Sequence, residues 1–332
     1  MVNINIPVSV LNLAPIREEQ SPKQAIDSMI DLAQATDKLG YKRFWIAEHH
    51  NSSTLVSSAT SILIKHTLEQ TENIRVGSGG TMLPNHSPLV VAEQFGTMAT
   101  IYPNRVDLGL GRAPGTDMMT ANALRRSTND SIYTFPEDVK SLLTYFGPKN
   151  KQSHVKAFPG VGTNTPIYIL GSSTDSAYLA AKLGLPYAFA AHFAPQQMEE
   201  AISIYRQRFE PSEYLDKPYM MICLNVIAGE TDEEAKLLSS SMYRFFLNFI
   251  RRSTMPLSPP VDNMDEYWNP MEKEMLSMGR VSFIGSKKSI RQQLTNFQEK
   301  YNVDEIMAVS YIYDQDKQKR SYEILKEVVD EK

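Results

Sequence analysis

Two adjacent histidines follow an acidic residue at the end of an apolar run, and these residue types suit proton transfer. Glu48, His49 and His50 come directly after residues 43–47, which have the composition of a strand. Histidine has an unperturbed pKa of ~6.5, so either imidazole could serve as an acid or a base near neutral pH. A metal site is a second interpretation, although adjacent histidines in an extended backbone point to opposite faces. A third is a turn in which one imidazole caps a backbone group.

A glycine-rich segment ends the next apolar run. Gly77, Gly79 and Gly80 stand within four consecutive positions, directly before Thr81. Such a segment predicts either a bulge or a ligand that approaches the backbone closely. A flat ligand resting on the backbone is one interpretation, and an ordinary loop is the other.

Two further strand ends carry groups that suit an anion. Arg112 lies within the glycine-rich run 109–115, where a guanidinium can meet a phosphate. Gly171, Ser172 and Ser173 open directly into a helix, so that backbone N–H groups, hydroxyls and the helix dipole converge. The serines could equally be plain helix caps. Together the two features favour one phosphate-bearing ligand, but the glycine spacing is not that of a dinucleotide-binding fold.

These strand ends belong to a regular alternation of short apolar runs with stretches of helical periodicity. Ser21, Pro22 and Gln24, for example, supply an N-cap, a first-turn proline and a capping-box glutamine. The predicted strands are 4–11, 43–47, 74–78, 105–110, 167–170, 187–190, 219–228 and 305–310. The predicted helices are 21–39, 57–69, 88–101, 134–146, 175–183, 195–209, 234–250, 287–301 and 317–329.

Eight strands alternating with helices predict an α/β fold of the (β/α)₈ TIM barrel type, with its chemistry at the carboxyl ends of the strands. An open doubly wound sheet obeys the same handedness rule and stays an alternative. We expect one domain over residues 1–332, with insertions at about 147–166 after strand 4 and 252–279 before strand 8. The second insertion, rich in Met, Pro and Ser, suits a lid or a surface excursion.

Composition narrows the class of protein. Apolar residues make up 42% of the 332-residue chain and charged residues 22%, values typical of a globular protein. The net charge of −4 and the lack of a basic block exclude nucleic acid as an expected partner. We expect no leader, no membrane span and a cytoplasmic location. Cys223 is the one cysteine, and its apolar neighbours indicate a core residue rather than a reactive thiol.

Five segments, in order along nearly the whole chain, resemble the bacterial luciferase-like flavin monooxygenases, and within them the non-bioluminescent, alkanal-monooxygenase-like branch. They are Phe44-Trp45-Ile46-Ala47-Glu48-His49-His50, the run 75–84, the run 93–118 with Asn104-Arg105-Val106-Asp107-Leu108-Gly109-Leu110-Gly111-Arg112, Gly171-Ser172-Ser173 with the run 180–186, and Phe283-Ile284-Gly285-Ser286.

The resemblance implies a cofactor and roles for these residues. Reduced FMN would lie across the barrel mouth, over a bulge at Gly79 and Gly80 that contains a cis peptide. Arg112 and the turn of Gly171, Ser172 and Ser173 would hold its phosphate. His49 would assist the formation or collapse of a flavin C4a-peroxide formed with O₂, while His50 and Glu48 fix its position, with no metal involved. The site would keep water away from the oxygenated flavin while a small organic substrate reacts.

The chain also departs from its relatives. Light-emitting members carry a cysteine where Gly111 stands, so we expect no light emission. A second phosphate-binding arginine would fall at Asn122, with Arg125 or Arg126 as possible substitutes. Nothing resembles a nicotinamide site, which implies a separate NAD(P)H:flavin reductase as functional partner. The family habit also implies a homodimer, formed through the second and third helices.

Three other functions remain open at this stage. The first is hydride transfer with a deazaflavin coenzyme, which the absorbance of the bound cofactor would distinguish. The second is flavin binding without turnover, which oxygen consumption with supplied reduced FMN would test. The third is a metal-dependent barrel hydrolase, which a metal assay would test. The sequence does not define the organic substrate.

Overall fold

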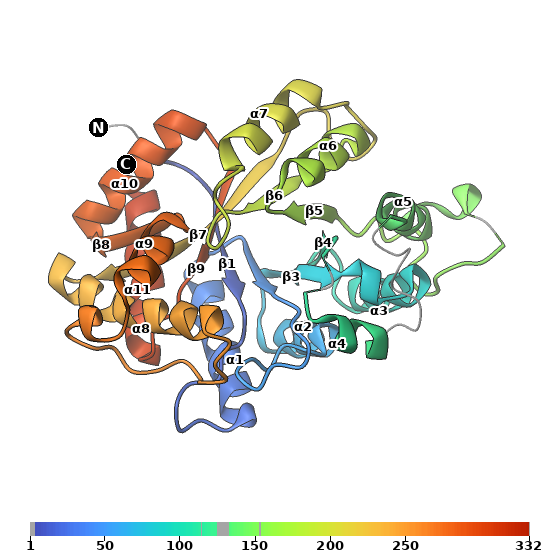
Figure 1. The fold of residues 1–332 in the computed structure, drawn as a ribbon. Helices are drawn as coiled ribbons and strands as arrows, with labels where there is room; N and C mark the ends of the chain where they lie inside the picture. The colour runs from blue at the N-terminus through green and yellow to red at the C-terminus, as the bar shows by residue number, and fades with distance from the viewer. Residues whose placement is uncertain (1–3, 114, 125–132, 153, 332) are drawn as a thin grey trace.

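Parallel strands close into a barrel at the centre of the molecule (Figure 1). The computed structural model describes residues 4–113, 115–124, 133–152 and 154–331. Within these ranges eight strands follow one another around the ring in the order β1-β2-β3-β4-β5-β6-β7-β9, and β9 pairs with β1. The predicted (β/α)₈ barrel is therefore confirmed, and the open sheet is excluded. The eight strands are β1 Val8–Asn12, β2 Arg43–Ile46, β3 Arg75–Met82, β4 Val106–Gly111, β5 Ile167–Gly171, β6 Tyr187–Ala190, β7 Met220–Gly229 and β9 Glu305–Val309.

Helices surround the barrel, and their ends follow local sequence signals. Helix α1 begins as predicted, with the Ser21 side chain accepting from the Gln24 backbone in a capping box and Pro22 at its first position. Gly184 adopts a left-handed conformation with φ of 59° and ends α6. The helices are α1 Pro22–Lys38, α2 Thr60–Gln70, α3 Pro88–Ile101, α4 Met118–Leu124, α5 Phe135–Phe146, α6 Thr174–Leu183, α7 Met198–Arg208, α8 Asp232–Ile250, α9 Pro270–Met278, α10 Lys287–Tyr301 and α11 Gln315–Asp330.

The second predicted insertion is more ordered than its composition suggests. It contains α9, which begins with a capping box of Asn269 and Glu272, and it leads into an additional strand, β8 Ser282–Ser286. Neither element was predicted; β8 is short, and three of its five residues are incompletely buried. β8 pairs with the carboxyl half of β7 from Asn225 onward, the residue at which the β7–β9 pairing ends. The strand thereby extends the barrel wall above β6.

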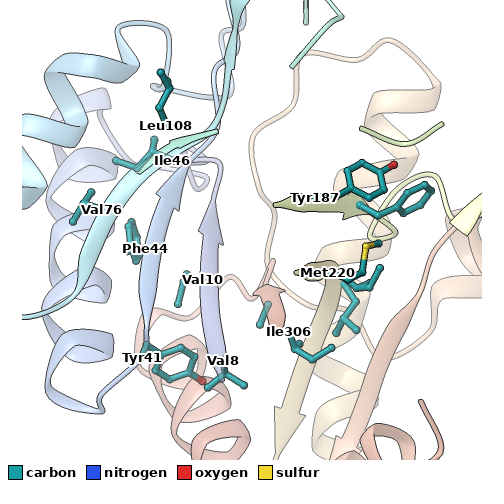
Figure 2. Close-up of a cluster of buried hydrophobic side chains, with 14 of the residues drawn as sticks. Val8, Val10, Tyr41, Phe44, Ile46, Val76, Leu108, Tyr187, Met220 and Ile306 are labelled. Atoms are coloured by element: carbon teal, nitrogen blue, oxygen red, sulfur yellow. The ribbon is translucent and has the colours of Figure 1, made fainter. Parts of the chain in front are cut away.

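Side chains from the strands separate into two packed layers. One set points outward and packs under the helices; Figure 2 shows members such as Val10 on β1, Phe44 on β2 and Val76 on β3. A second set, including Leu11, Trp45 and Tyr168, fills the barrel interior. This alternation is the two-residue period of a β-strand. Cys223 belongs to the interior set as predicted, and burial raises the pKa of its thiol.

A cluster of buried charges lies at the amino end of the barrel. Arg43, the first residue of β2, donates to Glu305 and Asp107, each at 2.7 Å. It also donates to the Tyr168 hydroxyl at 2.8 Å, and Trp45 donates to Asp107. Burial disfavours the charged form of Asp107, but its ion pairs with arginines outweigh burial and lower its pKa. The predicted site lies at the opposite, carboxyl end of the barrel.

Candidate active site

The predicted site residues gather at the carboxyl ends of four neighbouring strands. Glu48 and the two histidines follow β2, and Gly79 and Gly80 lie within β3. Arg112 follows β4, and Ser172 follows β5. These strands pair in the order β2-β3-β4-β5, so their ends form one continuous edge of the barrel mouth.

One carboxylate oxygen of Glu48 is hydrogen-bonded to two imidazoles. His50 Nε2 lies 2.9 Å from Glu48 Oε1, and His86 Nε2 lies 2.8 Å from it. Burial alone would raise the pKa of Glu48, but the hydrogen bonds from the two histidines outweigh burial and lower it to about 2. The other oxygen accepts from the Met82 backbone at 3.3 Å, which ties the network to the end of β3. Glu48 is therefore ionised at neutral pH and orients its neighbours.

The same three residues have ligand atoms within 4.8 Å of one another, close enough for a metal ion. However, both Nε2 atoms already stand at hydrogen-bond distance from a single oxygen, Glu48 Oε1. We interpret the group as a hydrogen-bonded network and assign no metal to it.

His49 stands apart from this network. Within the described part of the chain, Glu48 bonds His50 and His86 but makes no hydrogen bond to His49, and the buried Nδ1 of His49 has no partner. Burial lowers the pKa of His49 to about 4, an effect that the nearby Glu48 carboxylate opposes only in part. The imidazole is therefore neutral at physiological pH, and its unpartnered Nδ1 can accept a hydrogen bond from a ligand or donate one to it.

A bulge interrupts the carboxyl half of β3. The pairing of β3 with β4 shifts register between Ser78 and Thr81, and the peptide bond between Gly79 and Gly80 is cis, as the resemblance implied. A Cβ at Gly79 would lie 2.6 Å from the Leu11 side chain, and one at Gly80 would lie 2.9 Å from the Gly109 carbonyl oxygen. Glycine is needed at both positions because neighbouring atoms occupy the space of a side chain.

The proposed anion-binding groups also lie together. Arg112 forms a 3.0 Å ion pair with Asp175 in the first turn of α6, directly after Ser172 and Ser173. The side chain of Arg112 is 44% exposed and that of Asp175 is 64% exposed, so the pair contributes little energy and can open for a ligand. Neither serine hydroxyl forms a hydrogen bond within the described residues, and Ser173 begins α6 without a side-chain cap. A guanidinium, two hydroxyls and a helix amino terminus can therefore receive one anion.

Relatives assign the chain to a family. A sequence model of the family described as luciferase-like monooxygenase matches residues 6–301. The chain belongs to the luciferase-like monooxygenase family. It is 51% identical to the Bacillus subtilis protein YddN, with 98% of this chain and 96% of YddN covered. It is 45% identical to an Escherichia coli K12 protein named luciferase-like monooxygenase, with 100% and 99% of the two chains covered.

Solved structures agree with this assignment. Apo-MsnO8 superposes with a TM-score of 0.88 at 33% identity, over 98% of each chain. The oxygenating constituent of 3,6-diketocamphane monooxygenase from Pseudomonas putida, solved in complex with FMN, superposes with a TM-score of 0.72 at 18% identity, over 98% of each chain. At that identity the second likeness establishes the shared fold alone.

Two departures from the luciferase-like pattern can be located. A Cβ at Gly111, where light-emitting members carry a cysteine, would lie 2.7 Å from the Met82 sulfur, so a side chain fits only if Met82 moves. Asn122 lies on α4. Arg125 and Arg126, the possible substitutes for a second phosphate-binding arginine, lie outside the described residues.

Sequence reasoning missed two histidines at the mouth. His86 follows β3 by four residues, and His192 follows β6 by two residues. Burial lowers the pKa of His192 to about 3, with Arg280 and His49 adding to the shift. Both positions could have been found by inspecting every polar residue just beyond a predicted strand, because all these strand ends meet at one mouth.

Proposed function

We propose that this luciferase-like protein is a flavin-dependent monooxygenase that uses reduced FMN and O₂ to oxidise a small organic molecule. The observation that carries the proposal is the common edge of the barrel mouth. There β3, with the Gly79–Gly80 backbone, lies between β2, which His49 follows, and the strands β4 and β5, which the anion-binding residues Arg112, Ser172 and Ser173 follow. The set suits a planar ring with an anionic tail, and the FMN complex of the 3,6-diketocamphane enzyme supports the choice of ligand.

We assign cofactor binding and proton transfer to different residues of the mouth. Arg112, Ser172, Ser173 and the Gly171 backbone would hold the phosphate, while Gly79 and Gly80 would support the ring. Reduced FMN supplies the electrons that activate O₂ when it is bound. His49, neutral and lacking a partner on Nδ1, would move a proton at the mouth, and the Glu48 network with His50 would keep this wall of the site in place.

We further propose that a separate NAD(P)H:flavin reductase supplies the reduced FMN and that the protein acts in the cytoplasm. The 3,6-diketocamphane relative is named as an oxygenating constituent, a wording that supports a divided system. None of the helices within the described ranges is both long enough and apolar enough to cross a membrane.

Titration with FMN and with riboflavin, which lacks the phosphate, tests the cofactor site. We expect Arg112→Gln to weaken FMN binding by roughly 10- to 100-fold, because a charge-assisted contact to phosphate is lost. Riboflavin affinity should change by less than about threefold. Asp175→Asn should act in the opposite direction and strengthen FMN binding by a few-fold. The change frees Arg112 from its ion pair and removes a carboxylate that would repel the phosphate.

The matched control is Lys151→Gln, which breaks an exposed ion pair of similar geometry with Glu213, at 2.9 Å. It should leave both flavin affinities unchanged. Equal losses of FMN and riboflavin in Arg112→Gln would contradict the phosphate assignment. If the protein binds a deazaflavin coenzyme in preference to FMN, the function is hydride transfer and the proposal of oxygen activation is wrong.

We also propose a homodimer through α2 and α3. A groove between these helices is lined by Ile62, Met98 and polar residues, and Ile62 is 68% exposed while Ile101 is 54% exposed. Apolar side chains this exposed on neighbouring helices are typical of an interface. We expect Ile62→Asp to shift the protein from dimer to monomer in light scattering, whereas Met271→Asp on α9, an equally exposed position, should not. A monomeric wild type would refute the proposal.

A further inference from the structure

Among the described residues, one arginine at the mouth has no acidic partner. Arg280 stands just after α9 and two residues before β8 begins, directly after the second insertion. Its Nε is buried without a hydrogen-bond partner, and one Nη reaches the Leu276 carbonyl only at 3.5 Å, the outer limit for such a bond. It forms no ion pair within the described residues. The buried Arg43, by contrast, forms ion pairs with Asp107 and Glu305.

The surroundings of Arg280 are aromatic. Its guanidinium carbon lies 3.7 Å from the centre of the Phe246 ring, a cation–π contact that fixes the plane of the group. Tyr311 lies edge-on to the same Phe246 ring, at 5.1 Å. Burial lowers the pKa of Arg280 to about 10. An arginine keeps its charge at neutral pH here, so the group is a fixed cation in apolar surroundings.

The backbone places this cation beside His192, a second buried histidine of the mouth. Val281 donates to the Ala191 carbonyl at 2.9 Å, which sets Arg280 next to His192 at the end of β6. Asn225 donates to the His192 carbonyl at 2.8 Å and to the Ser282 hydroxyl at 3.1 Å, joining the two segments. His192 Nδ1 is buried and finds no partner in the described part of the chain, as is the case for Nδ1 of His49.

We propose that Arg280 binds a carboxylate on the organic substrate and thereby directs the rest of that substrate toward His49. The inference rests on the proposed function and extends it to the substrate class: a small organic acid with an apolar body. A half-buried cation without an acidic partner among the described residues is costly unless a ligand supplies the counter-charge, and a planar guanidinium held by an aromatic ring matches a carboxylate. The phosphate of FMN is assigned to the ends of β4 and β5, which β6 separates from β7 and β8.

Matched acid and amide probes test this proposal on the FMN-loaded protein. Hexanoate and phenylacetate are compared with hexanamide and phenylacetamide by isothermal titration. We expect the acids to bind and the amides to bind at least about tenfold more weakly. Arg280→Met should lower the affinity for the acids by at least about tenfold and remove the preference for acid over amide. Arg280→Lys should restore part of it, because charge returns without the planar fork.

Two controls keep the result specific. Arg251→Met removes another arginine of the same region, one that already pairs with Glu272 at 2.8 Å, and should leave acid binding unchanged. FMN affinity measured on each variant checks folding: it should stay within about twofold of wild type in Arg280→Met, whereas Arg112→Gln lowers it. Failure of the flavin proposal would thus appear in Arg112→Gln and failure of the carboxylate proposal in the Arg280 variants.

The carboxylate proposal is overturned if acids and amides bind equally, if neither acid binds the wild type, or if Arg280→Met weakens FMN instead of the acids. The last result would assign the guanidinium to the flavin.

Discussion

Replacing His49 by glutamine is expected to lower the rate of substrate oxygenation by roughly 10²- to 10⁴-fold, the usual contribution of a positioned proton-transfer group. The Glu48 network leaves out His49, although the two residues are adjacent in the sequence, and the buried Nδ1 of His49 has no partner among the described residues. Glutamine keeps the polarity and approximate length of the side chain but cannot take up a proton. FMN affinity should stay within about twofold of wild type, since the phosphate-binding groups are on other strands.

The measurement is the share of consumed O₂ that appears in product rather than in hydrogen peroxide, with reduced FMN supplied. His50→Gln is the matched control: it removes one hydrogen bond to Glu48 and should cost far less activity, because His86 still holds the same carboxylate. Equal losses in the two variants would mean that the network as a whole, rather than His49, governs the reaction.

The pH dependence of the wild type adds a second readout. With a pKa of about 4, His49 is neutral from pH 6 to pH 8 and should contribute no limb to the activity profile in that range. Stability has a different dependence. The unfolded histidine, with its ordinary pKa of ~6.5, takes up a proton before the folded one does, so the free energy of unfolding falls as pH drops from about 6.5 towards 4. His49→Gln should flatten part of this decline.

Strand and helix positions could largely be predicted from the sequence. The alternation of strand and helix patterns predicted all eight barrel strands, and the bounds of α3 and α10 agree with the predicted helices. Each of these elements buries one face under its neighbours, so tertiary packing and local pattern specify the same structure. The strand β8 escaped prediction because only two of its five residues are buried, and it is defined by pairing with the upper half of β7.

The site could be predicted in part. Parallel strand ends must meet at one mouth, so the placement of Arg112 beside the Ser172 turn follows from strand order alone. Which imidazole the carboxylate holds does not follow from it. Glu48 bonds His86, 38 positions away in the sequence, and leaves its immediate neighbour His49 unbound. Such choices depend on side-chain directions at the ends of two strands, which neither motif nor spacing specifies.

The amino end of the barrel offers the largest expected loss of stability. Arg43 is 2% exposed and pairs with two carboxylates that are both fully buried, Asp107 and Glu305. We expect Arg43→Met to lower the free energy of unfolding by about 3–5 kcal/mol, because both carboxylates lose a counter-charge where water cannot replace it. Asp107 keeps Arg75 at 2.6 Å, and Glu305 keeps the half-exposed Lys42 at 3.2 Å, so neither is left wholly unpaired. The loss of stability should therefore come mainly from Glu305, because Lys42, its remaining partner, is a weaker counter-charge than the Arg75 that remains beside Asp107.

A double variant separates this charge effect from lost packing. If stranded charge causes the instability, Arg43→Met combined with Glu305→Gln should be more stable than the sum of the two single changes predicts, by about 1–3 kcal/mol. Urea unfolding followed by fluorescence measures all three proteins, with Lys23→Met as the surface control. Lys23 pairs with Asp27 at 2.6 Å but is 81% exposed, so its loss should cost no more than about 0.5 kcal/mol. Strict additivity of the Arg43 and Glu305 changes would mean that the arginine stabilises the barrel through the packing of its side chain against Trp45 and Tyr168, and that its charge is incidental.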